Sequence, residues 1–355
     1  MNKAWPIAVA IIIFGIIVFI HEFGHFLFAK IFKIKVNEFA IGFGPSIFKK
    51  KKGETEYKIN LLPFGGYCAM EGEDEQSEDE RAFSRAKVWK RIIVVAAGAT
   101  FNIILGFILM FSSVAIDGAI QKDNLLITTK IASFDKGATT NQGNGLCEND
   151  IIKKINGRTV LTIDELSYLL GTNEGNEVDI TVERDGKTKE LYDVKFPSQK
   201  IDSKIYLTVD FYFYGEKATV TNCLKQGFLR TVSMGRIVFM SLGDLIAGKF
   251  GINEVSGPVG VTQVVSDAVT TSASNGLAGF SSLLNILCLI TVNLGVFNLL
   301  PIPALDGSRI LFLIIEAIRR KPVKKEAYVH AIGMAILLTL MVVLVFKDLW
   351  VWIFK

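Results

Sequence analysis

The sequence is poor in the residues that build disulfide scaffolds and multi-cysteine metal sites. Among 355 residues it holds four cysteines, scattered at Cys68, Cys147, Cys223 and Cys288 without a C-x-x-C pair. Free thiols are the preferred interpretation, although one bridge between Cys147 and Cys223 stays open. Histidine is rarer still, with three in the whole chain. The net charge of +4 gives no indication of nucleic-acid binding.

Apolar residues, by contrast, are abundant and concentrated. Half of the chain is hydrophobic and the mean hydropathy is positive. Four long apolar runs, with a charged middle section between them, are typical of a membrane protein and not of a soluble enzyme. Spans are expected at about residues 4–32, 92–116, 280–318 and 328–346. The first run lacks a basic leading segment and a small-residue cleavage site, so it is interpreted as a retained helix.

Lysine and arginine set the expected orientation of these spans. Basic residues crowd the segment between the first two spans, including Lys49–Lys52, and they return after the third span at Arg319 and Arg320. Under the positive-inside rule both segments face the cytoplasm. Both termini and the section between the second and third spans are then expected outside the cytoplasm.

Two of the three histidines fall in one motif near the end of the first span. His21-Glu22-Phe23-Gly24-His25 is H-E-x-x-H, and positions i and i+4 of a helix share a face. Two such imidazoles can bind one zinc ion, and the glutamate acts as general base for a zinc-bound water. Without a metal this cluster would be costly in an apolar span, so the metal site is favoured over a polar helix contact. Glu22 as a ligand is disfavoured, since it points off the histidine face.

A catalytic zinc needs a third protein ligand and an open position. Asp306 is the candidate, because it is an ionisable residue inside the third apolar block. That block is too long for one straight span, and Pro301 and Pro303 break it. Counted from the cytoplasmic flank, the depth of Asp306 matches that of His21 once tilt and the break are allowed for. The third histidine, His330, is interpreted as an interface residue.

Residues 36–70 alternate in polarity and are rich in glycine, which indicates strands around a basic turn. A cytoplasmic hairpin and a β-loop that dips toward the metal site both remain open. An exposed strand edge at that depth can pair with an extended substrate. In the second span Gly98, Asn102 and Gly106 recur every four residues, which predicts close helix packing and an interhelical hydrogen bond from Asn102.

The section after the second span is soluble in character. Short strand-like runs surround one expected helix, Ile163 to Leu170, which fits a small α+β module or a capped barrel. An amphipathic, basic helix is expected at about residues 222–249, lying on the outer membrane surface and not across the membrane.

Together these motifs resemble the site-2 protease family, peptidase M50, in its bacterial RseP/RasP-type branch. The matching elements are H-E-F-G-H, the β-loop with G-F-G and P-F-G-G-Y, G-P-V-G at Gly257–Gly260, and N-L-L-P-I-P-A-L-D-G at Asn298–Gly307. H-E-x-x-H alone is a weak signal, but with the later L-D-G it is highly specific. The middle module is similar to a PDZ domain. Departures are Asp-Gly-Ser in place of Asp-Gly-Gly, Ala99 where proline is frequent, and a single PDZ-like module.

The resemblance implies a polytopic α-helical membrane protein with about four spans, a membrane-associated β-loop and an external PDZ-like α+β domain. Residues 1–119 are expected to form an N-terminal membrane part, and residues 120–200 a PDZ-like domain. Residues 201–279 are expected to form an extracytoplasmic linker with the amphipathic helix, and residues 280–355 a C-terminal membrane part. It implies a zinc endopeptidase of a bacterial cell membrane. Its expected substrates are transmembrane segments of single-span proteins, such as anti-sigma factors or remnant signal peptides.

The resemblance also assigns roles to residues. It implies His21, His25 and Asp306 as zinc ligands and Glu22 as the catalytic base. Residues expected to line the site or contact substrate are Asn298, Pro301, Asn102, Gly42, Phe43, Gly65 and Gly66. The alternative from another class is an inactive polytopic scaffold whose PDZ-like module binds peptide termini, and the intact motifs argue against it. A transporter is disfavoured because the chain shows no internal repeat.

Overall fold

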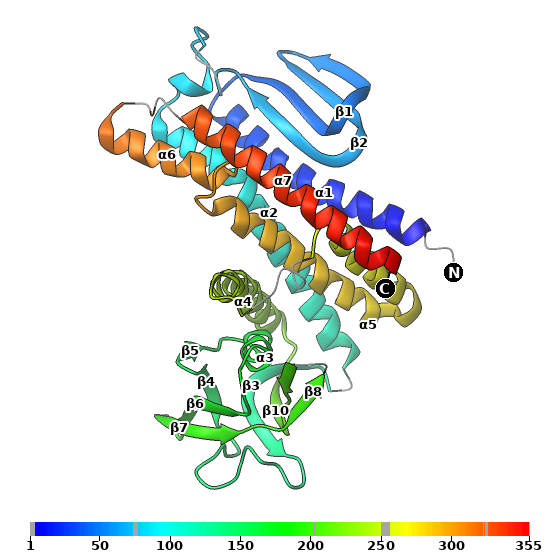
Figure 1. Ribbon diagram of the computed structural model, residues 1–355, viewed down its shortest axis with the longest axis vertical. Helices are drawn as coiled ribbons and strands as arrows, with labels where there is room; N and C mark the ends of the chain where they lie inside the picture. The colour runs from blue at the N-terminus through cyan, green and yellow to red at the C-terminus, as the bar shows by residue number, and fades with distance from the viewer. Residues whose placement is uncertain are drawn as a thin grey trace. The chain divides into compact units, whose positions relative to one another are not determined.

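A computed structural model describes residues 4–73, 77–121, 123–201, 204–249, 256–321, 323 and 326–354 (Figure 1). The chain forms two compact units. One consists of Met1–Gly106 with Ile252–Lys355, and the other of Phe107–Gly251. The first unit holds most of the apolar helix, and the second is rich in β-strands.

Among the described residues, four helices have the length and composition to cross a membrane: α1 (Ala4–Ile31), α2 (Val88–Ile120), α5 (Pro258–Leu299) and α7 (Glu326–Phe354). Much of their apolar surface is not covered by protein, and in α7 only 6% of the most apolar window is buried. Because so much exposed apolar surface is unstable in water, these faces are matched to lipid. The expected polytopic membrane protein is confirmed.

The third apolar block differs from the broken span expected at 280–318. Residues 258–279, expected as part of a linker, belong to α5, which starts with proline at its first position and kinks at Gly276 (φ 58°). α5 ends at Leu299, and α6 (Asp306–Arg319) is a separate, amphipathic helix outside the candidate spans. Serine and threonine lower the hydropathy of the first half of α5, so the apolar pattern does not reveal where the helix starts. Pro301 and Pro303 separate α5 from α6.

The expected strands form β1 (Val36–Lys52) and β2 (Thr55–Met70), which lie along α1 (Figure 1). One stretch of β1 pairs with two stretches of β2: residues 38–41 pair with residues 66–69 on one side and with residues 56–59 on the other. Residues 66–70 are therefore an edge strand, named here the edge segment. Gly42 and Gly65 adopt φ of 81° and 80°, a conformation that glycine adopts readily.

Glycines bring the helices of the first unit together. A Cβ on Gly24 of α1 would lie 2.6 Å from the carbonyl oxygen of Ala97 in α2, and a Cβ on Gly106 would collide with Val292 of α5. α1, α2, α6 and the sheet share a cluster of buried side chains, formed by Ala29, Ile34, Val36, Phe39, Cys68, Met70, Phe83, Val94, Val95 and Leu313. The short 3₁₀ helix η1 (Phe83–Arg85) contributes Phe83. The small-residue face predicted in α2 is thus a packing face.

The second unit is an α+β module with a long helix. Its main sheet has the strand order β10-β3-β4-β6-β7, with β5 paired to β4, and β8 and β9 form a separate hairpin. The elements are β3 (Leu125–Phe134), β4 (Ile151–Ile155), β5 (Arg158–Thr159), α3 (Ile163–Gly171), β6 (Glu177–Arg184), β7 (Lys187–Lys195), β8 (Ser198–Ile201), β9 (Lys204–Leu207), β10 (Phe211–Lys217) and α4 (Val220–Ile246). α4 matches the helix expected at 222–249. Ion pairs hold it to the module, among them Arg230–Asp164, Arg236–Glu165 and Arg158–Asp244.

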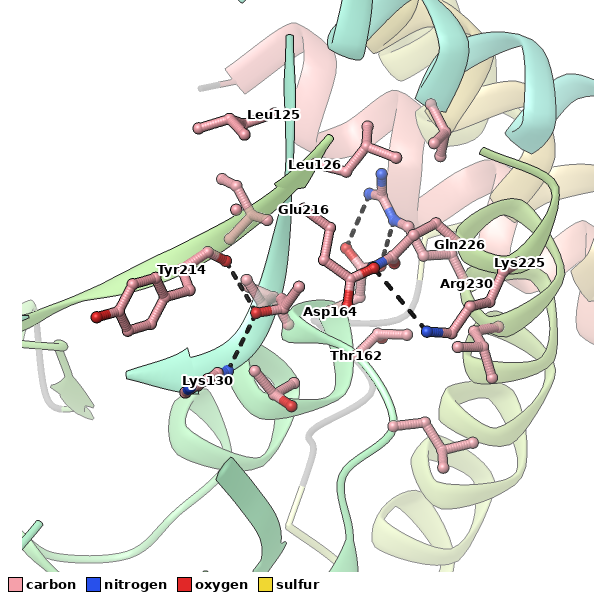
Figure 2. A pocket seen from close by; sticks show the side chains of 18 of the residues that line it. Leu125, Leu126, Lys130, Thr162, Asp164, Tyr214, Glu216, Lys225, Gln226 and Arg230 are labelled. Carbon is pink, nitrogen blue, oxygen red and sulfur yellow. Dashed lines mark hydrogen bonds and ion pairs between the residues drawn. The ribbon is translucent and has the colours of Figure 1, made fainter. Parts of the chain in front are cut away.

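A cavity of about 720 Å³ lies in this unit between β3, β10, α4 and the residues before α3 (Figure 2). Four of its charged side chains form ion pairs across the lining. Arg230 bonds Asp164 at 2.8 Å, and Lys225 lies 3.9 Å from Glu216. The lining carries side chains of both charge signs, since Lys130 and Lys153 also contribute to it beside Asp117.

Candidate metal centre

The predicted zinc ligands come from two helices of the first unit. His21 and His25 lie one turn apart near the end of α1, and Asp306 is the first residue of α6. The turn between α5 and α6 depends on two special positions. Ala304 adopts a φ of 76°, and a Cβ on Gly307 would collide with the backbone of Leu299 and Leu300. This tight turn presents Asp306 to α1.

The three candidate ligand atoms form a nearly equilateral triangle. Asp306 Oδ2 lies 3.2 Å from His21 Nε2 and 3.3 Å from His25 Nε2, and the two nitrogens are 3.3 Å apart. Zinc in a tetrahedral site has bonds of about 2.0–2.1 Å, which places neighbouring ligands about 3.3 Å from each other. The triangle therefore fits three corners of a zinc tetrahedron.

Hydrogen bonds behind the imidazoles orient them for this role. His25 Nδ1 donates to the carbonyl oxygen of Val94 at 2.9 Å, which leaves its Nε2 free to bind a metal. His21 Nδ1 lies 3.3 Å from the amide nitrogen of Asn102, which is completely buried. With the amide turned over, Asn102 Oδ1 accepts from His21 Nδ1–H, and His21 Nε2 is likewise free.

Unpartnered oxygens support the same conclusion. Within the described part of the chain, Asn102 Oδ1 and Asp306 Oδ2 are buried without a hydrogen-bond partner. Turning the Asn102 amide satisfies the first, and a cation between the three ligands satisfies the second. The residues present therefore fit zinc.

A cavity of about 610 Å³ opens at the ligands, and Glu22 lines it beside them. Cys68, in the edge segment, lines the same cavity. A Cβ on Gly66 would lie 2.9 Å from the carbonyl oxygen of Ala40 and 3.2 Å from Glu22 Cγ, so the edge segment packs tightly here. The carboxylate thus lies between the ligand set and the sheet edge.

Other predicted site residues are not among those that line the cavity. Asn298, in the last turn of α5, and the exposed Pro301 are not part of its lining among the described residues. Gly42, Phe43, Gly65 and Gly66 do not line it either. Phe43 stacks on Tyr67, which does line the cavity, with ring centroids 6.4 Å apart.

Two ion pairs near the site are not anticipated by the sequence. Arg309, which lines the cavity, bonds Glu73 at 2.5 Å, and Arg91 of α2 pairs with Glu316. Asp306, Arg309 and Glu316 share one face of α6, so both pairs anchor the helix that presents Asp306. The spacing on α6 is visible in the sequence, but the distant partners are not.

The model of peptidase family M50 matches residues 9–340. The chain belongs to peptidase family M50. A protein of Clostridium acetobutylicum named "Putative zinc metalloprotease" is 37% identical over 344 residues, which cover 96% of each chain. The regulator of sigma-W protease RasP of Bacillus subtilis is 31% identical over 426 residues, covering 96% of this chain and 97% of its own. Zinc metalloprotease RasP of Bacillus licheniformis is 30% identical over 423 residues with the same coverage.

Membership in the M50 family confirms three expectations. The chain is a site-2 protease relative, it is an enzyme of the metalloprotease class, and zinc is its cofactor. The inactive scaffold is not supported. Among the described residues of this M50 protease, His21, His25 and Asp306 are the one group of three His, Cys, Asp or Glu side chains close enough to hold a metal ion.

Proposed function

We propose that this M50 metalloprotease cleaves transmembrane segments within the bilayer, with His21, His25 and Asp306 as the zinc ligands. The observation that carries the proposal is the depth of the ligand triangle. α1 is a candidate span that ends at Ile31, and at 1.5 Å per residue His25 lies about 9 Å and His21 about 15 Å inside that end. A peptide bond that reaches these residues belongs to a membrane-embedded segment.

The chain's own residues supply binding and proton transfer. Bound zinc would polarise the scissile carbonyl and make water more acidic. Glu22 takes the proton from the attacking water and returns it to the leaving amine. The close packing of Gly66 against Glu22 Cγ limits the movement of the Glu22 side chain.

A substrate helix must unwind before attack, because its backbone groups are occupied by its own hydrogen bonds. The edge segment can hold the unwound strand. The N–H of Met70 donates to Glu73 Oε2 at 3.2 Å, so it points away from β1. Backbone groups alternate in direction along a strand, so the Gly66 N–H faces the same side and can bond an added strand.

The charge pattern supports a topology with both termini outside and the site toward the cytoplasm. Residues 120–200 would then form an extracytoplasmic PDZ-like domain, and its external position fits a role in selecting substrates already trimmed outside. Single-span proteins, such as anti-sigma factors or remnant signal peptides, are the proposed substrate class. The name of the Bacillus subtilis relative, regulator of sigma-W protease, supports the first of these.

The test compares the membrane proteome of cells that carry the parent or the Glu22→Gln protein. Loss of the base is expected to slow cleavage by about 10²–10⁴-fold, so single-span fragments should accumulate while purified protein keeps its zinc. Asp306→Asn should lower both zinc content and cleavage. Full cleavage in either variant would refute the assigned roles.

Strand addition is tested at Gly66. Gly66→Pro removes the outward N–H, whereas Gly66→Ala keeps it and adds a Cβ at the same crowded position. Cleavage is expected to fall further in the proline variant than in the alanine variant, with zinc content unchanged in both. Equal cleavage by the two variants would rule out a hydrogen bond from this edge.

A further inference from the structure

Four consecutive lysines, Lys49–Lys52, lie on the strand next to the turn between β1 and β2, and they are named here the lysine tip. All four are exposed. The acidic residues nearby are already matched by other cations: Glu54 bonds Lys30 at 2.8 Å and Arg81 at 2.7 Å, and Glu56 bonds Lys58 at 2.9 Å. The lysine tip is therefore a concentrated positive charge that its acidic neighbours do not neutralise.

The position of the turn gives the depth of this charge. Glu54 lies in the turn, and its partner Lys30 is in the last turn of α1, where the candidate span ends. Away from the turn the sheet lies deeper, because Gly66, which pairs with Ile41, packs against Glu22. Eight residues separate Glu22 from Lys30 along α1, or about 12 Å. The sheet thus runs alongside α1 from the end of the span toward the metal site (Figure 1).

Polarity changes along the sheet in the same direction. The cross-strand pair Phe48–Ile59 is apolar, and the next pair toward the turn is Lys49–Lys58. Away from the turn, large apolar side chains are between 48% and 68% exposed, at Phe43, Ile47, Phe48, Ile59, Leu61 and Leu62. The exposed apolar side chains of the sheet are thus followed directly by the four lysines of the tip. This change in polarity matches the boundary between the hydrocarbon core and the headgroups of a bilayer.

We propose that the lysine tip binds the phosphate groups of anionic phospholipids in the cytoplasmic leaflet. The inference rests on the proposed function, because it uses the same topology. The sheet that carries the tip also carries the edge segment. Lipid phosphates bound at the tip therefore hold the edge segment at the depth of Glu22, in addition to the packing of the sheet on α1.

The experiment uses the full-length protein in vesicles of equal parts phosphatidylcholine and phosphatidylglycerol. Trace spin-labelled forms of each lipid report which one the protein immobilises. The variant replaces Lys49–Lys52 by Gln, and a second variant replaces them by Arg to keep the charge. The matched control removes the same charge from exposed lysines of the second unit, Lys136, Lys154, Lys187 and Lys189.

The parent is expected to prefer phosphatidylglycerol. One lysine at an anionic surface changes affinity about fivefold, so the Gln variant should lose at least a fivefold preference that the Arg variant and the control retain. Molar salt should abolish the preference of the parent, because the screening length is then about 3 Å. A Gln variant with the preference of the parent would overturn the proposal and leave an acidic protein segment as the candidate partner.

Cleavage in detergent separates this inference from the proposed function. The Gln variant should keep its zinc and cleave a transmembrane substrate in lipid-free micelles at the rate of the parent. Its rate should fall below that of the parent only in vesicles that contain phosphatidylglycerol. Equal rates in those vesicles would refute the link between the lysine tip and the edge segment, whereas a parent protein inactive in every medium would refute the proposed function.

Discussion

Gly98→Ala is the substitution whose effect on the metal centre can be worked out most directly from the structure. A Cβ at this position of α2 would lie 2.7 Å from His25 Cε1 and 2.9 Å from His21 Cε1. Carbon atoms in contact are about 3.5–4.0 Å apart, so both imidazoles must retreat by about 1 Å. Zinc ligands tolerate displacements of about 0.2 Å. We therefore expect zinc affinity to fall about 100-fold, the upper end of the effect of losing an orienting partner.

The matched control is Gly106→Ala, two turns further along the same helix. Its Cβ would collide with Val292 of α5 and reaches neither histidine. Both variants should lose about 1–3 kcal/mol of stability from overpacking, but only Gly98→Ala should lose zinc. Competition with a chromophoric chelator measures zinc affinity. Thermal unfolding of the zinc-free protein measures the loss of stability that both variants share. Parental zinc affinity in Gly98→Ala would refute the geometry assigned to the site.

Three further predictions concern residues around the site and in the second unit. Asn102→Leu should lower zinc affinity about 10–100-fold, whereas Asn102→Asp should retain it, and chelator competition distinguishes them. Arg309→Gln should lower zinc affinity about tenfold, because it removes the ion pair with Glu73 that anchors the helix presenting Asp306. The exchange Arg309→Glu with Glu73→Arg should restore part of the affinity, and no recovery would argue against a direct pair. The Arg158 guanidinium beside Asp244 holds the pKa of that carboxyl below its usual value of 3.8, against the effect of burial. Its stabilising effect is therefore present above that value and is lost as pH falls through the lower folded pKa. Asp244→Asn should accelerate amide hydrogen exchange in Val220–Ile246 at neutral pH, and the difference should shrink at strongly acidic pH.

The elements predicted well from sequence are those whose signal is local. H-E-x-x-H sets two imidazoles on one helix face by spacing alone, and an ionisable residue in an apolar block directs attention to Asp306. The four-residue repeat of Gly98, Asn102 and Gly106 predicts a packing face for the same reason. Each of these features is complete within one turn or one helix.

The features that the sequence does not show depend on distant partners. The edge segment arises because one stretch of β1 pairs with two stretches of β2, which alternating polarity cannot reveal. The pair Arg309–Glu73 joins residues 236 positions apart. Hydropathy also misses the start of α5, because this serine- and threonine-rich stretch is held as helix by the packing of Val265, Ala268 and Val269 against α1.

X-ray absorption at the zinc edge of the purified protein shows whether His21, His25 and Asp306 hold the zinc. We expect a shell of nitrogen and oxygen ligands at about 2.0–2.1 Å with an imidazole contribution from two histidines. Asp306→Asn should change that shell. A sulfur ligand at about 2.3 Å, which Cys68 in the cavity lining would supply, or a spectrum unchanged by Asp306→Asn, would contradict this assignment.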